Sequence, residues 1–198
     1  RDYTFDNSYV GDFNGDGLDD SLVHSGTKFG AFLSDSENID VADSENIVVK
    51  PDPAAIGIDD WVIVPTNEFH VANFDASNGD DLYALNYDPV SDEVRVAMLR
   101  STYVEHTASG HYAGTTIDWS YVVEKSVDFD VVQNYAGSLP GAQYPLTPDV
   151  ELIVTNLNGD DRDDLIVVDT DPNSNPIVLK YISSGVSLVP FGGHFVDP

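Results

Sequence analysis

The sequence contains no cysteine, one methionine and only 8 lysine and arginine residues among 198. The lack of cysteine excludes a disulfide framework and a thiolate metal site. No apolar run approaches the ~20 residues that a membrane-spanning helix needs, so the sequence predicts no membrane insertion. Against the few basic residues stand 35 acidic ones, and the resulting formal net charge of −27 repels nucleic acid. We therefore expect no nucleic-acid partner.

Glutamate is also scarce, since 28 of the acidic residues are Asp and only 7 are Glu. Glutamate favours helices, whereas aspartate favours loops, caps and cation sites. The charge therefore indicates acidic loops rather than helix faces. The 41% of hydrophobic residues is ordinary for a globular chain of this length and is enough to form a core. The start, Arg1-Asp2-Tyr3, resembles that of a processed or trimmed chain.

Three segments of the chain align without gaps: residues 10–22, 71–83 and 154–166. Each has an apolar start, oxygen-bearing side chains at alternate positions, an Asp-Asp pair and an apolar continuation. The aspartate-rich loops begin at Asp12, Asn73 and Asn156, so the intervals are 73 − 12 = 61 and 156 − 73 = 83 residues. The longer second interval predicts an insertion at about residues 101–148. Internal repetition of this kind is typical of stacked repeat architectures.

Short runs rich in β-branched residues flank the loops and predict strands at 62–64, 82–85, 94–99, 152–154, 165–168 and 177–179. No stretch has a convincing helical period. The sequence predicts an all-β fold: about three repeated units of four antiparallel strands, as in the blades of a propeller. The expected units span roughly residues 1–50, 51–104 and 105–198. Trp61 and Trp119 are expected either to fill the interfaces between units or to stack on sugar rings.

The loops offer oxygen ligands suited to a hard cation such as Ca²⁺, which takes about six to eight oxygens. Side chains at loop positions 1, 3, 5 and 9 and the backbone carbonyl at position 7 are the candidate ligands. In the first loop (12–20) these are Asp12, Asn14, Asp16, Leu18 and Asp20. In the second loop (73–81) they are Asn73, Asp75, Ser77, Gly79 and Asp81. In the third loop (156–164) they are Asn156, Asn158, Asp160, Arg162 and Asp164.

Position 6 is expected to turn the loop with a positive φ. Gly17 permits this conformation, Asn78 tolerates it, and Asp161 does so less well. An EF-hand is excluded because its bidentate Glu at position 12 is absent: Val23, Ala84 and Val167 occupy that place.

The pattern Asp-x-Asn-Gly-Asp-Gly-x-Asp-Asp followed by an apolar strand resembles the FG-GAP or VCBS repeat, the blade unit of integrin-α-like β-propellers. The first loop matches closely, whereas the second and third depart at position 6. The resemblance implies up to three mainly structural Ca²⁺ ions, in a secreted, extracellular or cell-surface module that binds a glycan or a protein or serves in adhesion. The first loop offers three carboxylates and the others two each, so we expect the first site to bind Ca²⁺ most tightly.

Several alternatives stay open at this point. The loops are ordinary acidic turns if they bind no cation. Three units are too few to close a propeller, which has about four to eight blades. The chain is then a fragment of a larger propeller, self-associates to complete one, hides a fourth unit between residues 101 and 148, or forms an open stack.

A second function class rests on residues 105–112. Glu105, His106, His111 and Tyr112 combine two imidazoles, a carboxylate and a phenol, which are groups able to bind a metal or to act as acid and base. The alternative function is therefore a polysaccharide lyase or hydrolase, or its accessory domain. A solvated loop is the simpler interpretation, and we expect a binding module rather than an enzyme.

Overall fold

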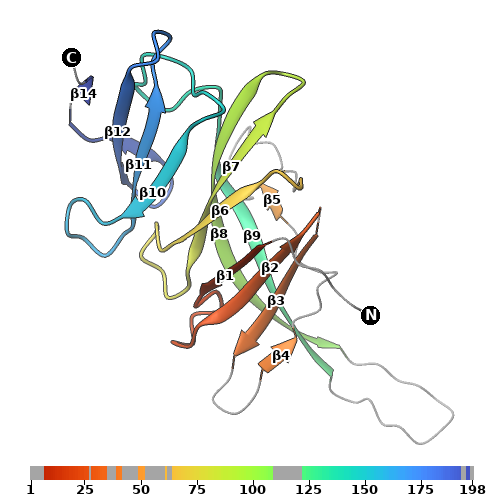
Figure 1. Ribbon diagram of the computed structural model, residues 1–198. Helices are drawn as coiled ribbons and strands as arrows, with labels where there is room; N and C mark the ends of the chain where they lie inside the picture. Colours follow the sequence, from red (N-terminus) through yellow and green to blue (C-terminus); the bar gives the residue numbers. More distant parts are fainter. Residues whose placement is uncertain are drawn as a thin grey trace, which may run out of the picture.

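The computed structural model describes residues 7–26, 28–34, 39–41, 49–51, 61, 64–108, 122–192 and 195–196. Over these residues the protein is all-β, with three sheets and no helix, which confirms the predicted fold class. No helix in this part of the chain could therefore span a membrane. The three sheets lie one after another in space, in the order in which their main strands occur along the chain (Figure 1).

The first sheet has the order β1-β2-β3-β4 and is antiparallel throughout. Its strands are β1 (Asn7–Gly11), β2 (Asp20–Ser25), β3 (Lys28–Ser34) and β4 (Ile39–Val41). The third sheet has the order β10-β11-β12-β13, with β14 also paired to β12. Its strands are β10 (Glu151–Thr155), β11 (Asp164–Thr170), β12 (Pro176–Ser183), β13 (Leu188–Pro190) and β14 (Phe195–Val196).

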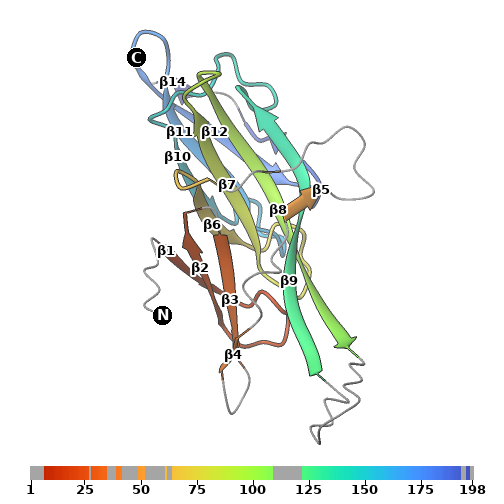
Figure 2. The ribbon, with the colours of Figure 1, turned by 90° about the vertical axis from the view of Figure 1, so that its right-hand side faces the viewer.

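The second sheet lies between the other two and has the order β6-β7-β8-β9-β5. Its strands are β6 (Glu68–Ala72), β7 (Asp81–Asp88), β8 (Glu93–Ala108), β9 (Val122–Ala136) and β5 (Val49–Pro51). Only β5 pairs in parallel among the described strands, along the outer side of β9. Figure 2 shows β8 and β9 running from the level of the third sheet to the level of the first.

The second and third sheets correct two details of the sequence interpretation. We expected units of four strands, but these two sheets have five each. We also expected the third unit to begin near residue 105, with an insertion around residues 101–148. Instead, β8 continues to Ala108 and β9 pairs along it, so both strands belong to the second sheet. The third sheet begins only at Glu151. The extra length is thus largely a long hairpin, whose strands gain ladder hydrogen bonds along their whole described length.

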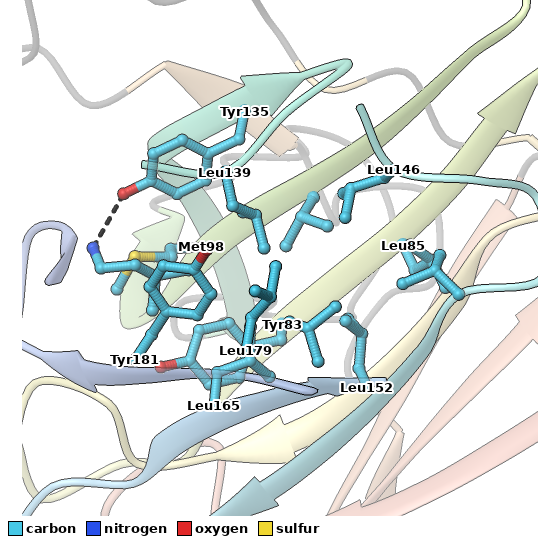
Figure 3. Close-up of a cluster of buried hydrophobic side chains, with 14 of the residues drawn as sticks. Tyr83, Leu85, Met98, Tyr135, Leu139, Leu146, Leu152, Leu165, Leu179 and Tyr181 are labelled. Atoms are coloured by element: carbon cyan, nitrogen blue, oxygen red, sulfur yellow. Dashed lines mark hydrogen bonds between the residues drawn. The ribbon is translucent and has the colours of Figure 1, made fainter. Parts of the chain in front are cut away.

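Two apolar cores separate the sheets, one on each side of the second sheet. β7 shows how one strand serves both: Leu82 and Ala84 face the first sheet, whereas Tyr83 and Leu85 face the third. Side chains alternate between the two faces of a strand, so burial on both sides requires the continuous apolar run of 82–85. Figure 3 shows the core between the second and third sheets, where the Tyr135 hydroxyl accepts a 2.8 Å hydrogen bond from the backbone N–H of Leu188.

Trp61 is 4% exposed and lies in the core between the first two sheets. This confirms the expected packing role for Trp61. Trp119 lies outside the described residues, as do residues 62 and 63 of the strand expected at 62–64. Val64 is described but lies in no strand; its backbone N–H donates to the Asn67 side chain in the turn before β6.

Candidate metal centre

The three aspartate-rich loops are equivalent hairpin connections between the first two strands of each sheet. In the first sheet, Gly11 pairs with Asp20. The same register joins Ala72 to Asp81 in the second sheet and Thr155 to Asp164 in the third. Position 9 of every loop is therefore the first residue of a strand, and the loops lie side by side along one edge of the stack (Figure 1).

The position-9 aspartates are buried, and two of them are fully hydrogen-bonded. Asp20 accepts from the backbone N–H groups of Phe13 at 3.1 Å and Ser34 at 2.8 Å. Asp164 accepts in the same way from Leu157 at 2.7 Å and Ser183 at 2.8 Å. Each carboxylate joins its own loop to the third strand of its sheet. A buried carboxylate is costly unless it is bonded in this way.

Asp81 is the exception among the three. It is 0% exposed, and its Oδ1 accepts from the Ser101 N–H at 2.9 Å, but its Oδ2 has no hydrogen-bond partner among the described residues. Burial, with a smaller contribution from the charge of Asp75, raises the pKa of Asp81 to about 8. Asn73, at position 1 of the same loop, also has a buried side-chain oxygen with no described partner. The second loop thus carries two buried oxygens with no hydrogen-bond partner among the described residues, and the nearby charge of Arg100 offsets only part of the effect of burial on the pKa of Asp81.

The first loop curls around Asp12. Asp12 Oδ1 accepts from the N–H groups of Gly15 and Asp16 at 2.8 and 3.0 Å, and Oδ2 accepts from Gly17 at 2.8 Å. Each carboxylate oxygen has two lone pairs, so these bonds orient the side chain, use both lone pairs of Oδ1 and leave one lone pair of Oδ2 for a cation. Asn14 Oδ1 likewise accepts from the Asp16 N–H at 2.9 Å.

The shared backbone turn lies at position 4 rather than at position 6. Gly15, Ala76 and Gly159 occupy position 4 with φ of 76°, 59° and 77°. At position 6, Gly17 has the expected positive φ of 87°. The expectation for Asn78 and Asp161 is wrong, because neither has a positive φ. In the first and third loops the position-4 N–H donates to the position-1 side chain, and this bond fixes where the chain reverses.

The third loop already contains a cationic side chain. Arg162 Nη1 lies 3.6 Å from Asp160 Oδ2, and the Arg162 N–H donates to Asp160 Oδ1 at 2.8 Å. The Arg162 and Asn158 hydrogen bonds lower the pKa of Asp160, so this carboxylate is charged. The guanidinium therefore already pairs with the carboxylate at position 5.

Neighbouring loops are joined by a pair of hydrogen bonds that the sequence analysis did not anticipate. Asp80 Oδ2 accepts from the Asp12 N–H at 2.8 Å, and the Asp80 N–H donates to the Asp12 carbonyl at 2.7 Å. Asp163 makes the same two bonds to Asn73, both at 2.8 Å. The aspartate at position 8 of one loop is therefore hydrogen-bonded to the backbone of position 1 in the preceding loop. The signal was the Asp-Asp pair ending each loop, of which only the second member was assigned a role.

The other candidate residues are not brought into a preformed cage. No group of three or more histidine, aspartate or glutamate side chains in the described part of the chain is arranged to hold a metal ion. In the second loop, positions 5 and 7 do approach each other, since the Ser77 hydroxyl donates to the Gly79 carbonyl at 3.1 Å. The side chains of Glu105 and His106, and the whole of His111 and Tyr112, lie outside what the structure describes.

Comparisons with known protein families, with curated proteins and with solved structures found no match to this chain. The fold and the loops define the class: an all-β protein of three stacked sheets, whose acidic hairpin loops are hydrogen-bonded to one another along one side of the stack.

Proposed function

We propose that this protein is a calcium-stabilised β-sheet module, in which Ca²⁺ bound in the hairpin loops holds the loops and the sheet stack in place. The observation that carries the proposal is the pair of buried, unpartnered oxygens in the second loop, Asn73 Oδ1 and Asp81 Oδ2. A buried carboxylate is strongly unfavourable when one of its oxygens is unbonded and its charge is only partly compensated. A divalent cation between positions 1 and 9 supplies that charge.

The chemistry of the loops fits calcium better than a transition metal. All candidate ligands are carboxylate, amide, hydroxyl or carbonyl oxygens, and hard cations prefer oxygen. Calcium also accepts irregular coordination with water completing the shell, whereas Mg²⁺ demands near-octahedral geometry. The absence of a closed carboxylate cage favours modest affinity, with Kd around 10⁻⁴–10⁻³ M, as in extracellular modules.

The three loops differ in what they offer. The first has three carboxylates at ligand positions and two glycines in its turn, so we assign it the tightest site. The second gains most stability from occupancy, because Asp81 is the most poorly compensated of the position-9 carboxylates. The third is the weakest site, because Arg162 competes for Asp160.

The role in glycan or protein binding, in adhesion and in an extracellular setting is proposed on the resemblance of the loops to FG-GAP repeats. The alternative, a polysaccharide-degrading enzyme using residues 105–112, has no described feature in its favour.

A calcium titration by isothermal calorimetry tests the proposal on metal-stripped protein. The wild type is expected to bind Ca²⁺, and Asp81→Asn is expected to lose one site while keeping the hydrogen bond from Ser101. The control Asp149→Asn changes an exposed aspartate outside the loops by the same charge and should titrate like the wild type. Absence of binding at 5 mM Ca²⁺, or an unchanged stoichiometry in Asp81→Asn, would contradict the proposal.

A further inference from the structure

The junction between neighbouring sheets is a repeated head-to-tail contact. The Asp80–Asp12 and Asp163–Asn73 pairs use the same loop positions, the same atoms and nearly the same distances. A contact of this kind joins two different surfaces, so each sheet has one face of each type. Three stacked sheets form two such junctions. One face of each type therefore remains uncovered, one at each end of the stack.

A second contact accompanies the hydrogen bonds at the first junction. A Cβ added to Gly11 would lie 2.8 Å from both Val71 Cγ1 and Asp80 Oδ2, so glycine lets the two sheets approach closely here. Val71 lies two residues before its loop, and the equivalent Val154 packs against the core that contains Ala72. At both junctions, the valine two residues before the loop (Val71 or Val154) thus packs against the preceding sheet.

The first sheet presents the unused half of this contact. Asp19 occupies position 8, like Asp80 and Asp163, but it is exposed whereas they are half-buried. Val10, the equivalent of Val71 and Val154, is 62% exposed, whereas they too are half-buried. No loop in the described part of the chain offers Asp19 the backbone N–H that its counterparts accept from.

The third sheet presents the complementary half. Asn156 occupies position 1, where Asp12 and Asn73 are half-buried by the next loop, yet Asn156 is exposed. No position-8 aspartate reaches its backbone within the described residues. Ile153, on the strand leading into this loop, is 41% exposed. One end of the stack therefore presents an acceptor, Asp19, beside the exposed Val10. The other end presents the Asn156 N–H beside the exposed Ile153.

We propose that these two ends bind each other between two copies of this chain, with Asp19 of each copy accepting from the Asn156 N–H of the other. A second copy is the occupant that supplies both missing halves at once and continues the junction already present twice within the chain. Two copies give 3 + 3 = 6 sheets, within the range of about four to eight blades that closes a propeller, whereas one copy gives three. The pair is closed, because both junctions are used.

Charge opposes this association, since each copy carries −27. Salt shortens the range of that repulsion, from a Debye length of about 8 Å at 0.15 M to about 3 Å at 1 M. The pair is therefore expected to strengthen as the salt concentration rises, which is the opposite of an association driven by opposite charges.

Sedimentation velocity of the full chain over a range of concentrations, in 5 mM Ca²⁺ with 0.15 M and 0.5 M NaCl, tests the proposal. A species of twice the 21.5 kDa chain mass is expected, and more of it at 0.5 M NaCl. Val10→Asp and Asp19→Ala should shift the protein to monomer by at least tenfold in dimer Kd, while Asp149→Ala should not. Because Thr155 is larger than Gly11 and Ala72 at the receiving position, Thr155→Ala should tighten the pair.

Melting curves separate loss of association from loss of folding. The Val10→Asp monomer should still unfold cooperatively, and its melting temperature should still rise with Ca²⁺. A monomer under all these conditions would overturn the proposal and leave the two ends for further repeats of a longer chain or another protein. Open-ended polymers, or a dimer that is insensitive to both Val10→Asp and Asp19→Ala, would overturn it as well.

Discussion

At the scale of single residues, Ala76 is held in a backbone conformation that suits glycine. Its φ of 59° lies in the left-handed region, where the other two loops have Gly15 and Gly159. A side chain with a Cβ costs roughly 1–2 kcal/mol there, because Cβ crowds the following carbonyl. The strain belongs to the second loop, which also contains the least compensated aspartate.

We therefore predict that Ala76→Gly stabilises the protein by about 1 kcal/mol in urea unfolding, with or without Ca²⁺. Ala136→Gly is the matched control, because Ala136 is also exposed but lies in β9 with no positive φ. Glycine in a strand costs about 0.5–1 kcal/mol, so the control should be destabilised. Equal effects of the two substitutions would show that the turn at position 4 is not strained.

Arg162 gives a second prediction at this scale. Its guanidinium lies 3.6 Å from the position-5 carboxylate of the third loop, so it competes with a metal ion for that oxygen. Arg162→Gln should tighten calcium binding at this loop by up to about fivefold, because an exposed ion pair is weak and screened. Calorimetry on metal-stripped protein measures it, and Lys180→Gln, which removes a positive charge from β12, is the control. Unchanged affinity in Arg162→Gln would show that the ion pair does not limit binding.

At the scale of elements, the close approach of β1 to the second sheet depends on Gly11. An added methyl group would lie 2.8 Å from Val71 Cγ1 and from the Asp80 oxygen that holds the first loop. We predict that Gly11→Ala destabilises the protein by about 1–3 kcal/mol, the usual cost of overpacking. Urea unfolding in the presence of Ca²⁺ measures this loss.

A double-mutant cycle identifies the cause of that loss. Val71→Ala removes the methyl group that the new Cβ would meet, so Gly11→Ala should cost less in that background. Additive effects of the two substitutions would instead mean that the close contact between β1 and the second sheet does not carry the cost.

Local sequence patterns predicted where the strands lie better than which strands pair with one another. The strands at 82–85, 94–99, 152–154, 165–168 and 177–179 were all expected from β-branched, apolar runs, and all lie in strands. The assignment of β9 to the second sheet could not be expected, because sheet membership depends on long-range pairing rather than on local propensity. The parallel edge strand β5 is three residues long and carries almost no sequence signal.

The candidate loops show the same division. Alternating oxygen side chains located all three loops in the sequence, because the spacing is local. The roles of Asp80 and Asp163 depend on which loop lies alongside, so their sequence position alone could not assign them. The isolation of Asp81 Oδ2 is also a tertiary feature, since Asp20 and Asp164 occupy the same loop position and are fully bonded.

At the scale of the whole molecule, the acidic loops and the stacked sheets stabilise each other. The loops of all three sheets are joined through Asp80 and Asp163, so an ion that fixes one loop also fixes the junction beside it. The cores on either side of the second sheet provide most of the favourable burial, whereas a formal charge of −27 opposes the compact state. In the proposed calcium-bound state, the ions would add favourable interactions at the loops and remove part of the repulsion.

A thermal melt of the protein in EDTA and again in millimolar Ca²⁺ tests this account most directly. Ligand that binds only the folded state adds about 2.7 kcal/mol per site at 100 times Kd, which is about 5–10 °C for a chain of this size. We predict an upward shift of that order or more in Ca²⁺, a much smaller shift in equal Mg²⁺, and a reduced shift in Asp81→Asn. An unchanged melting temperature, with no calcium found by metal analysis of the purified protein, would contradict the account and leave the loops as acidic turns.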